Sequence, residues 1–205
     1  MKRIVTFILA AAFAAVTAHA EITVGARGIF GWGIRTALES DYAAADIDRA
    51  KTVSYGGAVF AKLPLLEIMH LQAELGVTGH TISADGSDAS ITYAMIDIPL
   101  LLVTDLPFSD SFTLSPFIGL KLGCPLGKIL LDDGNDSARF DADAAPLWSA
   151  VVGSSAAIAA GAGAVVVDVR FDLAGAALKV TDDGISAAVA TPRPLLLSVG
   201  YQLPL

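Results

Sequence analysis

Hydrophobicity alternates with a period of two residues in eight separate segments of this 205-residue chain. In the third of them, Leu75 and Val77 alternate with Glu74 and Gly76. Because successive side chains of a β-strand point to opposite faces, each segment predicts a strand with one apolar face and one more polar face. The segments cover residues 22–34, 52–63, 68–78, 91–103, 112–123, 148–159, 165–176 and 193–205.

The connections between these segments alternate in length. After the odd-numbered segments they are long, and after the even-numbered ones they are short; the long ones span residues 35–51, 79–90, 124–147 and 177–192. This rhythm is typical of an outer-membrane barrel with both termini in the periplasm. It predicts an all-β fold, an eight-stranded antiparallel up-and-down transmembrane β-barrel. Asp-Gly steps at residues 85–86, 133–134 and 183–184 favour turns and predict that the later strands project beyond the bilayer as hairpins.

The first 20 residues have the pattern of a cleavable signal peptide. Lys2 and Arg3 precede an apolar run, and Ala18-His-Ala20 has the small-x-small form of a cleavage site. We therefore expect residues 21–205 to form the barrel domain. Removing Lys2 and Arg3 leaves 11 basic against 21 acidic residues, so the sequence carries no electrostatic footprint for nucleic acid.

Two other architectures compete with the membrane barrel. Residues 144–167 contain no charged side chain and are long enough for a transmembrane helix, but Gly161-Ala-Gly163 favours a hairpin turn. A soluble lipocalin-like barrel would turn the apolar faces inward instead of toward lipid. The hydrophobic fraction of 54% with only 17% charged residues favours a chain that places apolar surface against lipid.

Four strand-sized motifs occur in an order that resembles the PorT-like family of small outer-membrane β-barrel proteins. The motifs are IDIPLLL at residues 96–102, SPFIGL at 115–120, VDVRFDL at 167–173 and LSVGY at 197–201. The resemblance covers nearly all of residues 21–205. It implies an eight-stranded barrel in the outer membrane of a double-membraned bacterium, with no assigned activity.

The last segment also resembles the terminal signal by which outer-membrane barrels are passed to their insertion machinery. The residues that carry this signal are Ser198, Gly200, Leu203 and Leu205. The resemblance implies contacts with periplasmic chaperones and the insertion machinery during biogenesis, and with outer-membrane lipid afterwards. The chain ends on Leu205, where such barrels often end on an aromatic residue.

If the apolar faces meet lipid, the opposite faces place four acidic and four basic residues in the lumen. These are Arg27, Lys62, Glu74, Asp97, Lys121, Asp168, Arg170 and Asp172. The interior of an eight-stranded barrel is just wide enough for side chains, and unpaired charge there is costly. We expect a charge-balanced ion-pair network that plugs the barrel; the alternative is a lumen that conducts solutes or relays protons.

The sequence contains no phosphate-binding glycine loop and no metal-ligand spacing, and we expect no cofactor and no enzymatic activity. His80, Ser83 and Asp85 fall in one expected outer loop and are candidates for a rim enzyme acting on lipid or peptide. The acidic loop around residues 132–143 lacks EF-hand spacing and is interpreted as a solvated loop. We expect a structural or surface-interaction role, with a small-solute channel as the alternative and the surface ligand unknown.

Overall fold

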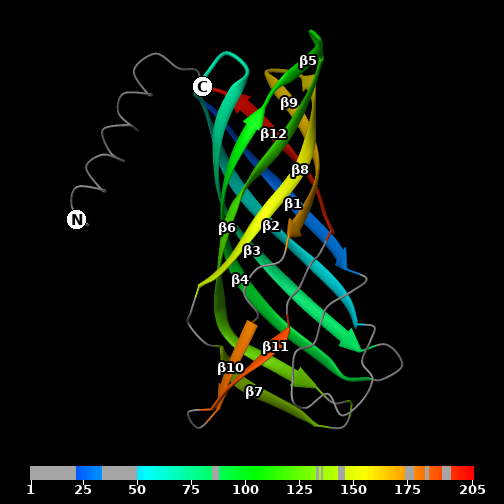
Figure 1. Ribbon diagram of the computed structural model, residues 1–205. Helices are drawn as coiled ribbons and strands as arrows, with labels where there is room; N and C mark the ends of the chain where they lie inside the picture. Colours follow the sequence, from blue (N-terminus) through cyan, green and yellow to red (C-terminus); the bar gives the residue numbers. More distant parts are fainter. Residues whose placement is uncertain are drawn as a thin grey trace, which may run out of the picture.

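The computed structural model describes residues 22–33, 50–84, 88–132, 134, 136–142, 146–173, 178–182, 185–190 and 195–205, and their regular structure is entirely β (Figure 1). The predicted signal peptide lies outside the described residues. The described residues form twelve strands: β1 (Thr23–Gly33), β2 (Ala50–Pro64), β3 (Met69–Ala84), β4 (Ser90–Thr104), β5 (Leu106–Ser109), β6 (Phe112–Asp132), β7 (Ser137–Ala142), β8 (Leu147–Ala160), β9 (Gly163–Leu173), β10 (Leu178–Asp182), β11 (Ile185–Ala190) and β12 (Leu195–Pro204).

Eight of these strands close into an antiparallel barrel in the order β1-β2-β3-β4-β6-β8-β9-β12. The last strand returns to the first, with Thr23 opposite Pro204 and Trp32 opposite Leu195. Each of the eight predicted segments overlaps one of these barrel strands, so the predicted fold class is confirmed. Closure leaves no unpaired edge within the ring, which removes the aggregation hazard of an open sheet.

The two ends of the barrel differ. Short connections, the β5–β6 hairpin and the C-terminus lie at one end, which we call the turn end (Figure 1). Leu205 donates a backbone hydrogen bond of 2.8 Å to Ile22, so the described chain begins and ends there. β7, β10 and β11 lie at the opposite end, which we call the loop end (Figure 1).

At the loop end the β-structure reaches further than the eight segments predict. β6 is 21 residues long; its first part pairs with β8, and its second part, from Lys128 to Asp132, pairs with β7. β10 pairs with both β7 and β11. Residues 124–147 and 177–192 are predicted as connections, but they contain β7, β10, β11 and the end of β6. The Asp-Gly steps predicted such hairpins, although not their pairing into one sheet.

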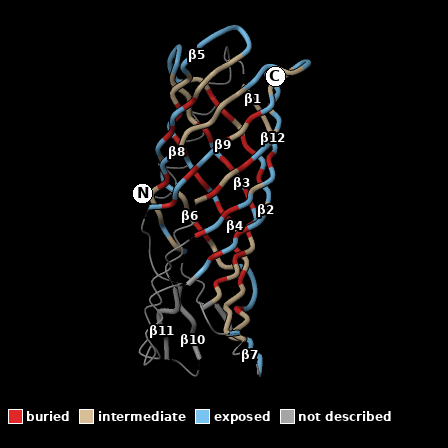
Figure 2. Tube along the Cα trace, turned by 90° about the vertical axis from the view of Figure 1, so that its right-hand side faces the viewer, coloured by how far each residue is buried: buried red, intermediate tan, exposed pale blue. Residues whose placement is uncertain are grey.

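Buried and exposed positions alternate along the barrel strands (Figure 2). On the outer face Val59, Leu75, Leu100, Leu120 and Val199 are each more than half exposed. Exposing such a continuous apolar belt to water is unfavourable, whereas contact with the hydrocarbon of a bilayer is favourable. The lipocalin-like alternative is therefore wrong, because its apolar face would point inward.

The transmembrane-helix alternative is also wrong. Residues 147–160 and 163–173, which include most of that candidate helix, form β8 and β9, joined by a tight turn in which Gly161 has a φ of 62°. Within the described part of the chain, no helix is both long enough and apolar enough to span a bilayer.

Candidate functional site in the barrel lumen

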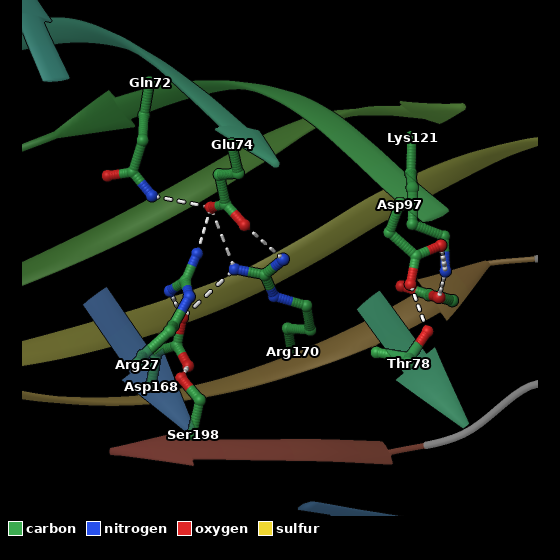
Figure 3. Close-up of polar contacts among 10 residues, drawn as sticks. Arg27, Gln72, Glu74, Thr78, Asp97, Lys121, Asp168, Arg170 and Ser198 are labelled. Carbon is green, nitrogen blue, oxygen red and sulfur yellow. Dashed lines mark hydrogen bonds and ion pairs between the residues drawn. The ribbon is translucent and has the colours of Figure 1, made fainter. Parts of the chain in front are cut away.

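Four charged side chains from three strands form one ion-pair cluster in the lumen, here called the central cluster (Figure 3). Arg27 on β1 pairs with Glu74 on β3 and with Asp168 on β9. Arg170 lies 3.0 and 3.1 Å from the two carboxylate oxygens of Glu74 and 3.1 Å from Asp168. All four residues are buried. Each arginine contacts both carboxylates, so the cluster is formally neutral.

The central cluster spans the full width of the barrel. In the ring of eight strands, β3 and β9 are four positions apart in either direction, so they face each other across the lumen. The bond between Glu74 and Arg170 is therefore a side-chain bridge along a diameter. Asp168 and Arg170 are both available on β9 because residues two apart on a strand point to the same face.

Neutral hydrogen-bond donors complete the coordination of the two carboxylates. Gln72 donates to Glu74 at 2.7 Å, and Ser198 donates its hydroxyl hydrogen to Asp168. A buried carboxylate needs such additional bonds, because Coulomb attraction alone rarely offsets the cost of removing it from water. Gln72 and Ser198 were not predicted as members of the network.

Two aromatic rings pack beside the arginines of the central cluster. The guanidinium carbon of Arg27 lies 5.1 Å from the centre of the Phe60 ring, and that of Arg170 lies 5.4 Å from the centre of the Phe117 ring. Both distances suit a cation–π interaction. Phe117 also packs with Leu101, Val103 and Val151 in a buried apolar cluster, so hydrophobic side chains fill the space beside the ion pairs.

A second cluster lies nearer the loop end, around Lys121. Lys121 pairs with Asp172 and lies 3.7 Å from Asp97. Thr78 donates to Asp97 and is 3.1 Å from Nε2 of His80. The ammonium group of Lys121 therefore pairs with two carboxylates. With the His80 ring neutral, the formal charge of this cluster is −1.

A third cluster lies at the turn end and centres on Asp105. Lys62 donates to both Asp105 oxygens, at 2.7 and 2.5 Å, and Ser115 donates to one of them at 2.7 Å. His70 Nδ1 lies 3.4 Å from the same carboxylate. Asp105 is in the connection after β4, outside every alternating segment, which is why the sequence pattern missed it.

The eight residues predicted for the lumen all lie on the inner faces of their strands: Arg27, Lys62, Glu74, Asp97, Lys121, Asp168, Arg170 and Asp172. Seven of them make up the first two clusters. Lys62 does not join them, because it bonds to Asp105 at the turn end. With Asp105 included, the nine groups carry five acidic and four basic charges, so the predicted exact balance omitted one carboxylate.

The two described candidate rim residues, His80 and Ser83, do not lie together in an outer loop. His80 was placed in an outer loop, but it lies within β3, only 3% exposed. Its Nδ1 atom is 2.8 Å from the Ser54 hydroxyl, and its ring stacks on Tyr93 with centroids 5.0 Å apart. Ser83 lies three residues further along β3, on the opposite face, and Asp85 lies outside the described residues. The loop interpretation of His80 was wrong because β3 continues to Ala84.

The four residues of the expected insertion signal occupy two different environments. Ser198 is buried and bonds to Asp168, and Gly200 lies opposite Arg27. Leu203 and Leu205 are exposed, the latter by 74%. Ser198 and Gly200 therefore face the lumen, whereas Leu203 and Leu205 are exposed at the turn end. Whether the insertion machinery reads these residues stays a prediction.

The site lacks the features of a metal centre within the part of the chain that the structure describes. Among those residues no group of three or more His, Cys, Asp or Glu side chains could hold a metal ion. The carboxylates of the lumen are instead engaged by arginine, lysine and hydroxyl groups. The chemistry available to this arrangement is charge pairing between opposite walls of the barrel.

These features define the class of protein: the chain has the fold of an eight-stranded outer-membrane β-barrel. The outer membrane protein OprG from Pseudomonas aeruginosa superimposes with a TM-score of 0.62 and 9% sequence identity, covering 91% of this chain and 96% of that chain. Neisserial surface protein A gives a TM-score of 0.48 and 12% identity, over 91% of this chain and 99% of that chain. The attachment invasion locus protein Ail of Yersinia pestis gives 0.44 and 10%, over 90% and 100%.

No protein-family model and no curated protein matches the chain. At identities near 10%, the likeness to OprG establishes the fold alone. OprG is an outer membrane protein, but the role of this chain has to be argued from its own residues.

Proposed function

We propose that this chain is an outer-membrane barrel protein with a structural or surface-interaction role, and that its lumen is plugged. The observation that carries the proposal is the bond between Glu74 and Arg170 across the barrel diameter. Phe60 and Phe117 beside the arginines add bulk to the same region. A barrel closed in this way acts through its outer surface and its ends.

Conductance tests the plug directly. Purified protein reconstituted in a planar lipid bilayer should give no steady unitary currents, while a porin inserted in the same bilayer should conduct. Steady unitary currents from this protein would overturn the plugged lumen and favour the small-solute channel. Heat-modifiable migration on a gel would show that the reconstituted protein is a folded barrel.

The apolar belt and the strand lengths support a location in the outer membrane, with export directed by the signal peptide of residues 1–20. Fractionation tests this, since the folded protein should be recovered with the outer membrane. Recovery in the soluble periplasmic fraction would contradict the proposed location.

We assign the turn end to the periplasm and the loop end to the cell exterior. Two exposed positions test this orientation, Ala138 on β7 and Ser109 on β5. In a Cys124→Ser background, Ala138→Cys should react with a membrane-impermeant maleimide on intact cells. Ser109→Cys should react only after the outer membrane is permeabilised. The reverse pattern would invert the assignment.

Membership of the PorT-like family is part of the same proposal and is supported by the four ordered strand motifs. In this proposal the barrel meets outer-membrane lipid, and periplasmic chaperones and the insertion machinery handle it during biogenesis. The proposal includes no catalytic role, and the burial of the candidate base His80 beside Ser54 and Thr78 supports it. The surface partner is left to experiment.

A further inference from the structure

The sheet that extends from the barrel at the loop end finishes on an edge strand. From the barrel outward the strand order is β6-β7-β10-β11 (Figure 1). β10 pairs with β7 on one side and with β11 on the other. Among the residues that the structure describes, β11 pairs with β10 alone. One row of backbone N–H and C=O groups of β11 therefore faces away from the sheet.

The pairing of β11 with β10 determines which backbone groups point to this open edge. Asp182 pairs with Ile185 across a two-residue connection, and Thr181 pairs with Ser186. In an antiparallel ladder, hydrogen-bonded pairs alternate with non-hydrogen-bonded pairs, and the pair that closes a two-residue hairpin is a hydrogen-bonded one. Ile185 and Ala187 therefore bond to β10, while the N–H and C=O groups of Ser186 point to the open edge.

The sequence of β11 lacks the usual protection of an edge strand. It reads Ile-Ser-Ala-Ala-Val-Ala, with no charged residue and no proline. Native sheets commonly block an exposed edge with lysine, with proline or with an inward-pointing charge, because free donors and acceptors pair readily with another strand. The open edge of β11 is therefore competent to accept a further strand.

The charges that flank β11 in the sequence favour a second copy of the same strand, in antiparallel orientation. Asp182 and Asp183 precede the strand, and the next charged residue after it is Arg193. Antiparallel pairing of two copies brings the acidic start of each strand toward the basic end of the other, whereas parallel pairing brings like charges together. A two-fold axis between the copies also engages both open edges at once, so the assembly closes as a dimer.

We propose that the open edge of β11 binds the β11 edge of a second copy of this chain, which joins the two loop-end sheets into one antiparallel sheet. The interaction deepens the proposed surface-interaction role, and its location at the cell exterior rests on the proposed orientation. The pairing itself depends neither on the plugged lumen nor on the orientation. A protein that does not pair would leave both of those proposals untouched, and a conducting or inverted barrel would leave the pairing untouched.

Sedimentation equilibrium of the mature protein, refolded in density-matched detergent micelles, measures the association. A pair of six-residue strands buries little surface, so we expect a reversible dimer with a dissociation constant in the micromolar to millimolar range. Protein that remains monomeric at about 1 mM would overturn the proposal, because this concentration populates even a dimer with a millimolar dissociation constant.

Amide hydrogen exchange, followed by NMR, locates the interface in the wild-type protein. The amide of Ser186 should exchange rapidly in the dilute monomer and at least about tenfold more slowly in the dimer, because pairing makes it a sheet donor. The amides of Ile185 and Ala187 should be protected in both states by their bonds to β10. A dimer in which the Ser186 amide stays unprotected would place the contact elsewhere and overturn the proposal.

Ser186→Pro and Ser186→Thr form a matched pair of variants. Proline removes the N–H group at the open edge but is tolerated on an edge strand, so the dissociation constant of the dimer should rise at least about tenfold. Threonine keeps the N–H group and suits a strand, so Ser186→Thr should dimerise as the wild type does. Equal dimerisation of the two folded variants would contradict the role of the β11 edge. If Ser186→Pro does not fold, hydrogen exchange at Ser186 in the wild type decides the matter.

Discussion

Glu74 accepts hydrogen bonds of 3.0 and 3.1 Å from Arg170, which lies on the strand opposite it in the barrel. The strands that carry these two residues share no backbone pairing. The side-chain bridge therefore connects walls of the barrel that the sheet itself joins only through three intervening strands on each side. Such a contact restrains the cross-section of the lumen at this level.

Glu74→Ala should destabilise the folded barrel by about 3–5 kcal/mol, because it leaves Arg27 and Arg170 to share Asp168 as their remaining carboxylate partner in the central cluster. Urea unfolding in detergent micelles, followed by loss of heat-modifiable migration, measures this change.

Glu67→Ala is the matched control for that experiment. Glu67 is exposed in the turn between β2 and β3, so its replacement should change the unfolding free energy by less than about 0.5 kcal/mol. Equal stability of Glu74→Ala and Glu67→Ala would show that the central cluster contributes nothing to the fold.

Lys62→Ala should cost less than Glu74→Ala, about 1–3 kcal/mol, because the turn-end cluster is nearer to solvent. The side chains of Lys62 and Asp105 are 9% and 23% exposed, against 3% or less for Arg27 and Glu74. Asp105 also keeps its bond from Ser115. The same urea titration makes the comparison, and a larger loss for Lys62→Ala would contradict this ranking.

The alternating pattern predicts which charged residues of the strand segments point inward, because strand geometry fixes the face of each side chain. Arg170 and Asp172 follow Asp168 at steps of two, and all three are buried. The pattern could not predict the ion-pair partner of each residue. Partners depend on the order of strands around the ring and on their register, and Asp105 has no place in any alternating segment.

The alternation of apolar and polar residues along β3 inverts just before His80. Up to Val77 the apolar residues of β3 point outward, but beyond it Thr81 lies on the outer face and Ile82 is buried on the inner face. Ile82 packs there with Tyr93, Met95 and Ile129 in an apolar core at the loop end. A strand that leaves the bilayer meets water outside, so its polarity inverts. The apolar alternation that predicts this strand therefore stops before His80, although β3 continues to Ala84.

Gly200→Ala should destabilise the barrel by about 1–3 kcal/mol through overpacking. A Cβ atom at this position would lie 2.3 Å from the carbonyl oxygen of Ala26 and 2.6 Å from the Cβ atom of Arg27. Gly200 therefore has a packing requirement independent of any insertion signal. Urea unfolding of the refolded purified protein isolates this effect, and an unchanged midpoint would contradict it.

Leu205→Ala, unlike Gly200→Ala, should leave the stability of the folded barrel nearly unchanged. The side chain of Leu205 is exposed at the turn end, so its removal should change stability by less than about 0.5 kcal/mol. If the terminal residues act as an insertion signal, assembly of this variant into the outer membrane should nevertheless slow several-fold in pulse-chase experiments. Assembly at the wild-type rate would refute the role of Leu205 in that signal.

Trp32 and Trp148 are the two tryptophans of the chain, and both are exposed on the outer face of the barrel, by 41% and 56%. If that face meets lipid, vesicles with brominated acyl chains should quench most of the tryptophan emission, while aqueous acrylamide should quench little. Tyr93→Trp in a background with Trp32→Phe and Trp148→Phe provides the control, since Tyr93 is 3% exposed on the inner side. Its emission should resist both quenchers. Strong acrylamide quenching without bromolipid quenching in the wild type would mean that the apolar belt does not face a bilayer.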